Sequence, residues 1–205
     1  DIIMLSEVRD HPTARLVVQA AMTGHQVWTT VHANSDLAIL DRMRDLGVHQ
    51  DLLCDPTIIS GLICQRLVKN LCPHCKIALS DKVSQCDERD IHRFMSVLNI
   101  ENVYVQGEGC DACRGSGIMG RTVVAETVVT DNTLMGLIKS GDRLAAIRYI
   151  RQDLKSISML GHAIQKINAG IVDPFQAEDV VGPLDTADFE SEIVSDTTTD
   201  THHGG

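Results

Sequence analysis

The stretch DIIMLSEVRDHPTARLVVQAAMTGHQVWTTVHAN, residues 1–34, sets the predicted fold. Its apolar run Ile2–Leu5 predicts a strand, the alanine-rich run that follows predicts a helix, and the β-branched and aromatic run Gln26–Val31 predicts a second strand. Two strands joined by one short helix lie parallel with a right-handed connection, so their carboxyl ends meet at the same edge of the sheet. Ligands of open α/β sheets bind at that edge, which here carries Glu7 and His32.

Polar residues gather around these two predicted strands. Glu7, Arg9 and Asp10 follow the first strand, while His25 and His32 flank the second. In nucleotide-hydrolysing sheets, an acid at such a strand end faces the magnesium ion and the terminal phosphate, where it orients the attacking water. A single acid after a strand is a weak signal, because surface acids are common there. The hypothesis of a nucleotide site therefore depends on Glu7 and His32 emerging side by side.

The rest of the chain is predicted to be mainly helical. Ser35 has the side chain of an N-cap, and the helix after it has one apolar face. A further helix is predicted over residues 55–72, because apolar residues recur there at helical spacing. An insert at residues 76–109 contains one amphipathic helix, and residues 121–129 predict a strand. Three short helices are then expected to begin near Asp131, Asp142 and Asp173.

Two Cys-x-x-Cys turns form the most specific motif of the sequence. They are Cys72-Pro-His-Cys75 and Cys110-Asp-Ala-Cys113, and residues 76–109 separate them. Without a secretory signal, paired motifs of this kind favour a metal over disulfides. Four thiolates from two tight turns give the tetrahedral sulfur site that zinc prefers, with no open position for catalysis. The sequence thus predicts a structural zinc ion that holds the insert together.

Other interpretations of these cysteines are weaker. Cys72-Pro-His-Cys75 alone resembles the centre of a dithiol oxidoreductase, but that centre follows a strand, and here a helix is predicted before it. Residues 110–117, CDACRGSG, resemble one cysteine-glycine repeat of a class of heat-shock co-chaperones, although the motif occurs once here. Neither pair precedes a histidine, as covalent haem attachment requires.

Length and composition limit the class of protein. The chain has 205 residues, of which 43% are hydrophobic, enough for one core or two small ones. A net charge of −10 argues against nucleic acid as a partner, because phosphate contacts need clustered Lys and Arg. No apolar run approaches the roughly 18 residues of a membrane span, so a cytoplasmic location is expected. Residues 183–205 carry many acids and no Lys or Arg, which predicts a disordered acidic tail.

Four motifs in one order carry a family resemblance. LSEVRD, TGHQVWTTVHAN, ICQRLVKNLCPHCK and GCDACRGSGIMGRTVVAE occur in succession within residues 1–182. This series resembles the C-terminal domain of the type II secretion and type IV pilus assembly ATPases. The resemblance implies a RecA-like parallel-sheet core fragment with an inserted tetracysteine zinc subdomain and C-terminal helices. The four parts expected are an ATPase core fragment, a zinc subdomain, a C-terminal strand with helices, and the acidic tail, at residues 1–71, 72–120, 121–182 and 183–205.

The resemblance also implies roles for individual residues. Glu7 stands at the Walker B position as the catalytic glutamate, and His25 and His32 form a histidine box. The residues expected near the nucleotide are Arg9, Asp10 and Arg66. The expected zinc ligands are Cys72, Cys75, Cys110 and Cys113. Ser6 replaces the glycine that is usual in the family, and Ala33 stands where threonine is common; serine is small enough that the geometry of Glu7 is expected to be kept.

One part of the ATPase pattern is absent from the sequence. The 205 residues contain no Gly-x-x-x-x-Gly-Lys-Ser/Thr loop of the kind that cradles ATP phosphates. ATP and magnesium are therefore expected only in an intact parent protein, of which this chain is a fragment that is inactive alone. The resemblance implies that the parent is a homo-hexamer, peripheral at the cytoplasmic face of the inner membrane, where it contacts platform proteins of a pilus or secretion machine. The alternative from another class is a non-enzymatic, zinc-stapled docking module.

Overall fold

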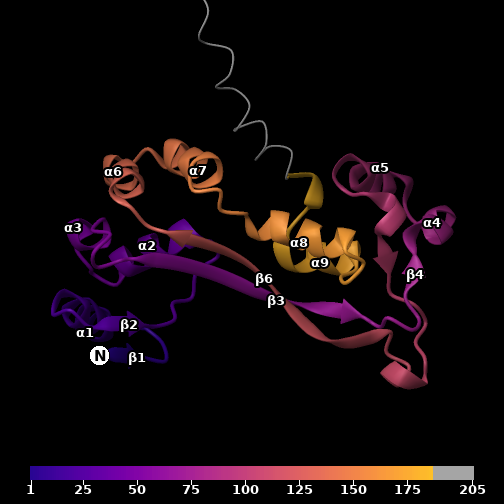
Figure 1. Cartoon of the computed structure of the whole chain (residues 1–205), viewed down its shortest axis with the longest axis horizontal. Helices are drawn as coiled ribbons and strands as arrows, with labels where there is room; N and C mark the ends of the chain where they lie inside the picture. The colour runs from indigo at the N-terminus through magenta and orange to yellow at the C-terminus, as the bar shows by residue number, and fades with distance from the viewer. Residues whose placement is uncertain (187–205) are drawn as a thin grey trace, which may run out of the picture. The chain divides into compact units, whose positions relative to one another are not determined.

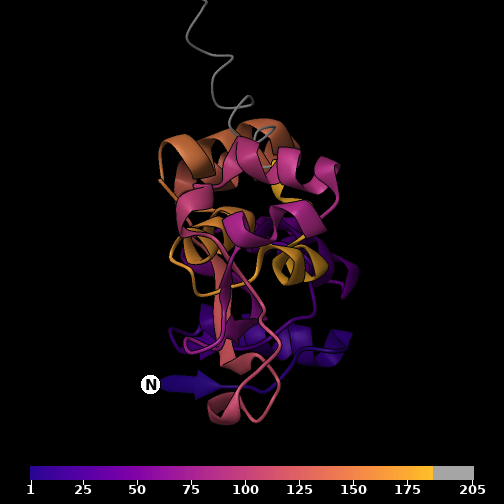
Figure 2. The same cartoon turned by 90° about the vertical axis from the view of Figure 1, so that its right-hand side faces the viewer.

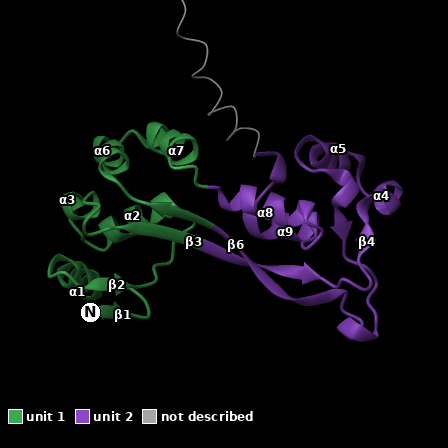
Figure 3. Ribbon diagram, viewed as in Figure 1, with its two compact units in different colours: residues 1–64, 126–156 green, residues 65–125, 157–205 purple. Residues whose placement is uncertain are grey.

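The structure, a computed structural model, describes residues 1–186 in two compact units (Figure 1). The first unit consists of Asp1–Cys64 and Glu126–Ser156, and the second consists, within the described residues, of Gln65–Ala125 and residues 157–186 (Figure 3). These units group segments by their packing, so the four-part division expected along the sequence stays a prediction. Of the predicted acidic tail, residues 187–205 lie outside the described part. Within residues 1–186, no helix combines the length and the apolar character that a bilayer span requires.

The first unit opens with the strand–helix–strand arrangement that the sequence predicts. β1 (Ile2–Met4), α1 (His11–Met22) and β2 (Gln26–Trp28) follow in order, and β1 pairs with β2 in parallel. Asp10 caps α1 by accepting a hydrogen bond from an amide of the first turn, where Pro12 needs no acceptor of its own. The predicted parallel pairing is confirmed, so the carboxyl ends of both strands lie at one edge.

Four helices complete the first unit. They are α2 (Asp36–Asp45), α3 (Gln50–Leu53), α6 (Asn132–Ser140) and α7 (Arg143–Gln152). Ser35 caps α2, as predicted, by accepting from the amide of Ala38. Two groups of buried side chains form the core of this unit. The group around α1 and α2 includes Val8, Ala14, Val18 and Met43, and the group shared by α2, α6 and α7 includes Leu37, Leu40, Leu134, Ala146 and Ile150.

A strand replaces most of the helix predicted over residues 55–72, so that prediction is wrong. β3 (Gly61–Leu71) is hydrogen-bonded to β6 (Ile118–Val129), a strand that the sequence also predicts. The buried apolar residues of β3 are Leu62, Cys64, Val68 and Leu71, and the first three lie on one face of the strand at even-numbered spacings. Ile63 and Leu67 lie between them and are exposed. The apolar residues of this segment fit both a helical and an alternating spacing, and pairing with β6 selects the strand.

The second unit combines the insert with C-terminal helices. Its helices and short strands are β4 (Ile77–Ala78), α4 (Leu79–Lys82), α5 (Glu88–Val97), β5 (Tyr104–Val105), α8 (Met159–Asn168) and α9 (Pro174–Val181). β4 pairs with β5 antiparallel, and α8 lies beside α9 (Figure 2). Phe94 of α5 packs edge-on against Phe175 of α9, with the ring centroids 5.0 Å apart. The insert therefore shares one core with helices that are distant in the sequence.

The sequence predicts three helices after β6, and the structure has four α-helices between β6 and residue 186. α6, α7 and α9 begin where expected, and each is capped by the aspartate before it: Asp131, Asp142 and Asp173. The additional helix is α8, which Ser158 caps by accepting from the amide of Gly161 at 3.0 Å. A glycine in the first turn has a low helix propensity, and it weakens the sequence pattern for α8.

Candidate functional sites

Glu7 lies where the chain leaves β1, and the backbone on both sides of it is fixed. The Val8 amide donates to the Thr30 carbonyl at 2.9 Å, and the Thr30 hydroxyl donates to the Ser6 carbonyl. Val8 itself is buried. These contacts hold the loop after β1 against the loop after β2, and they place the Glu7 carboxylate at the edge where both strands end.

The Glu7 carboxylate contacts one basic side chain with each oxygen. His32 Nε2 lies 3.0 Å from Oε1, and Arg9 Nη2 lies 2.6 Å from Oε2. The side chain of Glu7 is 17% exposed, whereas those of Arg9 and His32 are 78% and 89% exposed. The hydrogen bond from Arg9 holds the pKa of Glu7 below its usual range; partial burial opposes this, and the charges of Arg9 and His32 add to it. We call Glu7, Arg9 and His32 the Glu7 edge; at neutral pH its carboxylate is ionised.

The other residues predicted for a nucleotide site have different surroundings. His25 lies at the opposite end of β2 from His32, with its Nδ1 3.1 Å from the hydroxyl of a neighbouring threonine. Asp10 is the N-cap of α1, and hydrogen bonds from the first turn lower its pKa. Arg66 belongs to β3 in the second unit, where its Nη1 donates to the preceding carbonyl at 3.0 Å. The roles predicted for His25, Asp10 and Arg66 stay predictions.

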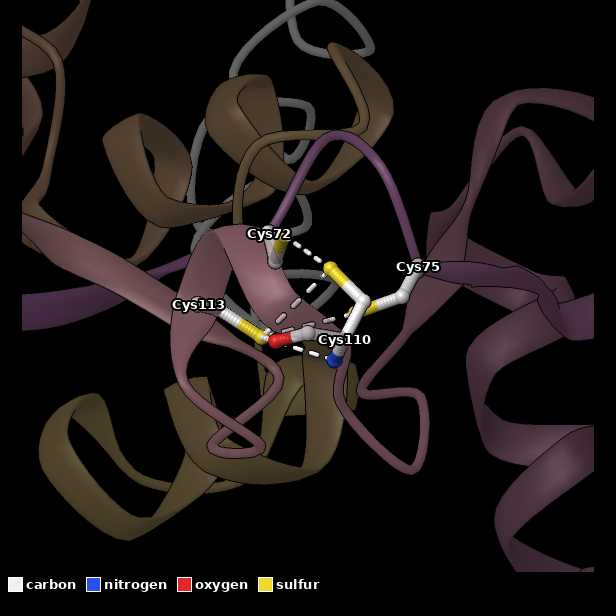
Figure 4. A group of neighbouring side chains, drawn as sticks. All are labelled: Cys72, Cys75, Cys110 and Cys113. Carbon is white, nitrogen blue, oxygen red and sulfur yellow. Dashed lines mark hydrogen bonds between the residues drawn. The ribbon is translucent and has the colours of Figure 1, made fainter.

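The four predicted metal ligands converge after β3 and before β6 (Figure 4). We call them the cysteine cluster: Cys72, Cys75, Cys110 and Cys113. All four sulfur atoms lie within 4.8 Å of one another, and three of the sulfur pairs are 3.8 Å apart. Sulfurs placed tetrahedrally about 2.3 Å from a zinc ion are separated by about 3.8 Å. The cluster therefore has both the donor set and the size of a four-coordinate zinc site.

Backbone amides favour thiolate formation in the cysteine cluster. The amides of Cys110 and Gly117 donate to Cys113 Sγ at 3.2 and 3.1 Å. These bonds lower the pKa of Cys113 to about 6, although burial opposes them. Burial and the neighbouring thiols raise the pKa of Cys75 to about 12. Cys113 therefore loses its proton before Cys75, and a bound dication would allow all four thiols to ionise together.

Close packing of the backbone brings the two cysteine turns together. The Cys72 amide donates to the Gly117 carbonyl at 2.9 Å, which ties the end of β3 to the start of β6. Gly107 lies so near the first turn that a β-carbon there would stand 1.8 Å from the Cys75 carbonyl oxygen. Gly109, in the turn beside the metal ligands, has a φ of 102°, a value that L-residues rarely adopt. Glycine at these positions is thus a requirement of the geometry.

Comparison with known proteins shows the family. The model of the family described as type II/IV secretion system protein matches residues 1–182. The chain belongs to this family. The type IV pilus assembly ATPase TfpB of Acinetobacter baylyi is 39% identical over 148 residues, which are 72% of this chain and 24% of that protein. The type II secretion system protein E of Dickeya dadantii is 33% identical over 173 residues, which are 83% of this chain and 32% of that protein.

The chain spans about a third or less of the length of these two members of the type II/IV secretion system protein family. A solved structure supports the fold. The crystal structure of the pilus retraction motor PilT with bound ADP aligns with 88% of this chain and 39% of its own, with a TM-score of 0.57 and 17% sequence identity. At that identity the likeness shows the fold alone. Together with the cysteine cluster, it confirms the fold class predicted from the sequence.

Two buried acids of the first unit are functional candidates to which the sequence motifs assign no role, although Glu126 is the last residue of the fourth motif. Asp36, at the start of α2, and Glu126, in β6, are 5% and 6% exposed. Glu126 alternates with Val124 and Val128, which are both buried, so a period of two places its side chain on the inward face. That alternation is a usable sequence signal for Glu126. No comparable signal marks Asp36.

Proposed function

We propose that the chain is the C-terminal part of a hexameric motor ATPase, and that the intact protein hydrolyses ATP to drive type IV pilus assembly or type II protein secretion. It works at the cytoplasmic face of the inner membrane, against platform proteins of the machine. The observation that carries the proposal is the contact of Glu7 with His32 at the carboxyl ends of two parallel strands. The names of the relatives support it, because they include secretion and pilus assembly ATPases.

Glu7 orients the attacking water in this proposal. Its low pKa makes the carboxylate a weak base but a good acceptor, which suits the positioning of water better than strong proton abstraction. Both carboxylate oxygens are engaged, one by Arg9 and one by His32, so a water binds Glu7 directly only after one partner turns away. The exposed partners, Arg9 and His32, are the kind of donors that a terminal phosphate attracts. ATP and magnesium supply the phosphoryl group and neutralise its charge, held by a phosphate loop elsewhere in the intact protein.

The cysteine cluster holds a structural zinc ion in this proposal. Four thiolates fill a tetrahedral zinc site, which leaves no position for water or substrate. Cys72 and Cys75 after β3 and Cys110 and Cys113 before β6 would hold the ion, which would join the two turns and fix one end of the insert. Its contribution is to the stability of the second unit rather than to the chemistry of ATP.

Glu7→Gln in the full-length protein tests the proposed function. The amide keeps the shape of the side chain but loses the charge that holds water, so turnover falls by about 100-fold or more while nucleotide binding is kept. The matched control is Glu101→Gln, which changes an exposed glutamate of the second unit and leaves turnover as it was. Unchanged ATP hydrolysis in Glu7→Gln would remove Glu7 from the mechanism.

A non-enzymatic docking module is the second candidate function. The absence of a phosphate-binding loop from the 205 residues favours it, because this chain by itself has no means to hold ATP phosphates. ATP binding by the full-length protein distinguishes the two functions. The motor predicts saturable binding that depends on a loop encoded upstream, and this chain alone hydrolyses no ATP. A full-length protein that binds no nucleotide would favour the docking module.

A further inference from the structure

The first turn of α2 is held by three side-chain acceptors. Ser35 Oγ accepts from the Ala38 amide at 3.3 Å, and Asp36 Oδ1 accepts from the Leu37 amide at 2.6 Å. Both bonds are local, and they stabilise the helix wherever it lies. The third bond runs from the Asp36 amide to Oε1 of Glu126, which is 2.8 Å away and 90 residues distant in the sequence. Of the three, this bond alone ties the start of α2 to another element.

Glu126 is a buried junction between β6, α2 and α7. Its Oε2 lies 3.4 Å from Nη2 of Arg151, a residue of α7. The side chains of Glu126 and Arg151 are both largely covered. A covered carboxylate that moves away from its cation and its amide donor leaves polar groups without partners, which is costly in free energy. The carboxylate therefore acts as a fixed point to which the start of α2 is attached.

The start of α2 is close along the chain to the Glu7 edge. His32 stands four residues before Asp36, and its Nε2 contacts Glu7 Oε1 at 3.0 Å. Four residues span no more than about 14 Å when fully extended, so the segment that links His32 to α2 is short. A displacement of the helix start is transmitted to the imidazole. The Cys64 thiol also donates to the Ala33 carbonyl at 3.9 Å, so β3 provides a second contact to this segment.

We propose that Glu126 is a positioning residue for His32. By accepting a hydrogen bond from the Asp36 amide, it sets where α2 begins and holds residues 32–35 so that the imidazole reaches Glu7. Arg151 holds the Glu126 carboxylate, and through it α7 is linked to the same segment. The consequence for turnover rests on the function proposed above, whereas the positioning of His32 does not.

A purely structural role for Glu126 is the competing explanation. A structural role would depend on all the contacts of the Glu126 side chain, including the pairing of its charge with Arg151. The positioning role depends only on an acceptor oxygen at the Asp36 amide. Two variants separate these requirements. Glu126→Gln keeps an acceptor oxygen and removes the charge, while Glu126→Asp keeps the charge and withdraws the oxygen by one methylene. Glu126→Ala removes both.

NMR of the 205-residue chain measures both ends of the proposed link. Exchange of the Asp36 amide reports the bond to Glu126, and the ring signals of His32 report its contact with Glu7. We expect Glu126→Gln to keep both measurements close to the wild-type values. Glu126→Asp and Glu126→Ala speed Asp36 exchange by about 10-fold or more, and they move the His32 signals toward those of a Glu7→Ala reference, in which the contact is lost.

The control is a substitution in the same unit that removes a comparable hydrogen bond elsewhere. Tyr149→Phe removes the bond from the Tyr149 hydroxyl of α7 to Asp131, which is 2.7 Å long, and should leave the His32 signals in place. Unmoved His32 signals in Glu126→Asp, together with fast exchange at Asp36, would overturn the proposal. His32 signals displaced as far in Glu126→Gln as in Glu126→Asp would also overturn it, because only charge and stability would then matter.

Turnover by the full-length protein separates this proposal from the proposed function. We expect kcat to fall by about 10-fold in Glu126→Asp and to be kept in Glu126→Gln, with the KM for ATP changed by no more than about 2-fold, because a misplaced group slows the chemical step more than it weakens binding. If the His32 signals move and kcat is unchanged, the result supports the positioning of His32 by Glu126. It also shows that His32 has no catalytic role.

Discussion

The cysteine cluster and the Glu7 edge are organised in opposite ways. The cysteine cluster takes all four donors from this chain, at the sulfur spacing of a zinc site, and two backbone amides donate to the sulfur of Cys113. The Glu7 edge has one covered carboxylate and two exposed basic side chains. A metal site whose ligands all come from one chain would contribute to folding by itself, whereas the role proposed for the Glu7 edge requires groups supplied from elsewhere. Damage to the cluster should therefore unfold structure, and damage to the edge should slow chemistry.

Loss of one cysteine ligand is the largest effect that this comparison predicts. Cys110→Ser leaves three thiolates, so we expect zinc content to fall from about one ion per chain to near zero and the melting temperature of the second unit to drop by more than about 10 °C. Metal analysis and thermal unfolding measure both quantities. The control is Cys86→Ser, a cysteine outside the cluster, which should keep its zinc. A Cys110→Ser chain that melts like the wild type would show that the cluster does not support the fold.

Gly107→Ala tests whether backbone approach is as necessary as the ligands. A β-carbon at Gly107 would meet the Cys75 carbonyl oxygen at 1.8 Å, so the two turns must separate. We expect zinc affinity to fall by at least about 10-fold and the melting temperature to drop by several degrees. Gly136→Ala is the matched control, because its β-carbon meets nothing within 4 Å and alanine favours the helix. Zinc affinity that survives Gly107→Ala would mean that the turns have room to separate.

Local signals account for what the sequence predicts correctly. The caps Asp10 and Ser35 mark the starts of α1 and α2, and the Cys-x-x-Cys spacing marks the cysteine cluster. The adjacency of Glu7 and His32 is not local, yet it follows from the rule that a short helix joins parallel strands. The fold of the β1–α1–β2 segment and the centre of each site are therefore predictable from the sequence.

Tertiary contacts account for what the sequence does not predict. β3 carries apolar residues at two overlapping periods, and its partner β6 lies almost fifty residues further along the chain. The ion pair of Arg9 with Glu7 depends on the rotamer of a long exposed side chain, which no sequence pattern specifies. The bond from the Asp36 amide to Glu126 depends on the packing of α2 against β6. Each of these features is decided by a partner that is distant in the sequence or by a side-chain conformation.

Arg9→Gln should affect the chemistry of the Glu7 edge without unfolding the first unit. Arg9 lowers the pKa of Glu7, so its loss lets that pKa rise, and the acid limb of the rate profile should move to higher pH. We expect turnover by the full-length protein at neutral pH to fall by about 10-fold, because a donor that attracts the terminal phosphate is lost. The melting temperature should stay within about 2 °C, because exposed ion pairs contribute little to stability. Arg15→Gln, at an exposed position of α1, is the control. An acid limb that stays in place would mean that Arg9 does not set the ionisation of Glu7 during turnover.

Asp36→Asn should give the smallest effect of these variants. The direction of the change in melting temperature shows whether the buried charge of Asp36 stabilises or destabilises the first unit. Burial raises the pKa of Asp36 above 3.8, and the charge of Glu126 raises it further, while the Leu37 amide and Arg151 oppose the shift. A carboxyl whose pKa is higher in the folded than in the unfolded chain lowers the free energy of unfolding when it ionises. This loss of stability grows as the pH rises from 3.8 through the pKa of the folded chain, and it stays constant at higher pH. Asparagine keeps an oxygen for the Leu37 amide and cannot ionise, so the variant should melt about 2–4 °C higher at pH 7 and equal the wild type near pH 3. A variant that melts lower at pH 7 would mean that the charge of Asp36 stabilises the first unit. The expected result would instead show that the first unit keeps a destabilising acid beside Glu126, whereas in the cysteine cluster the proposed zinc ion would compensate the buried charge.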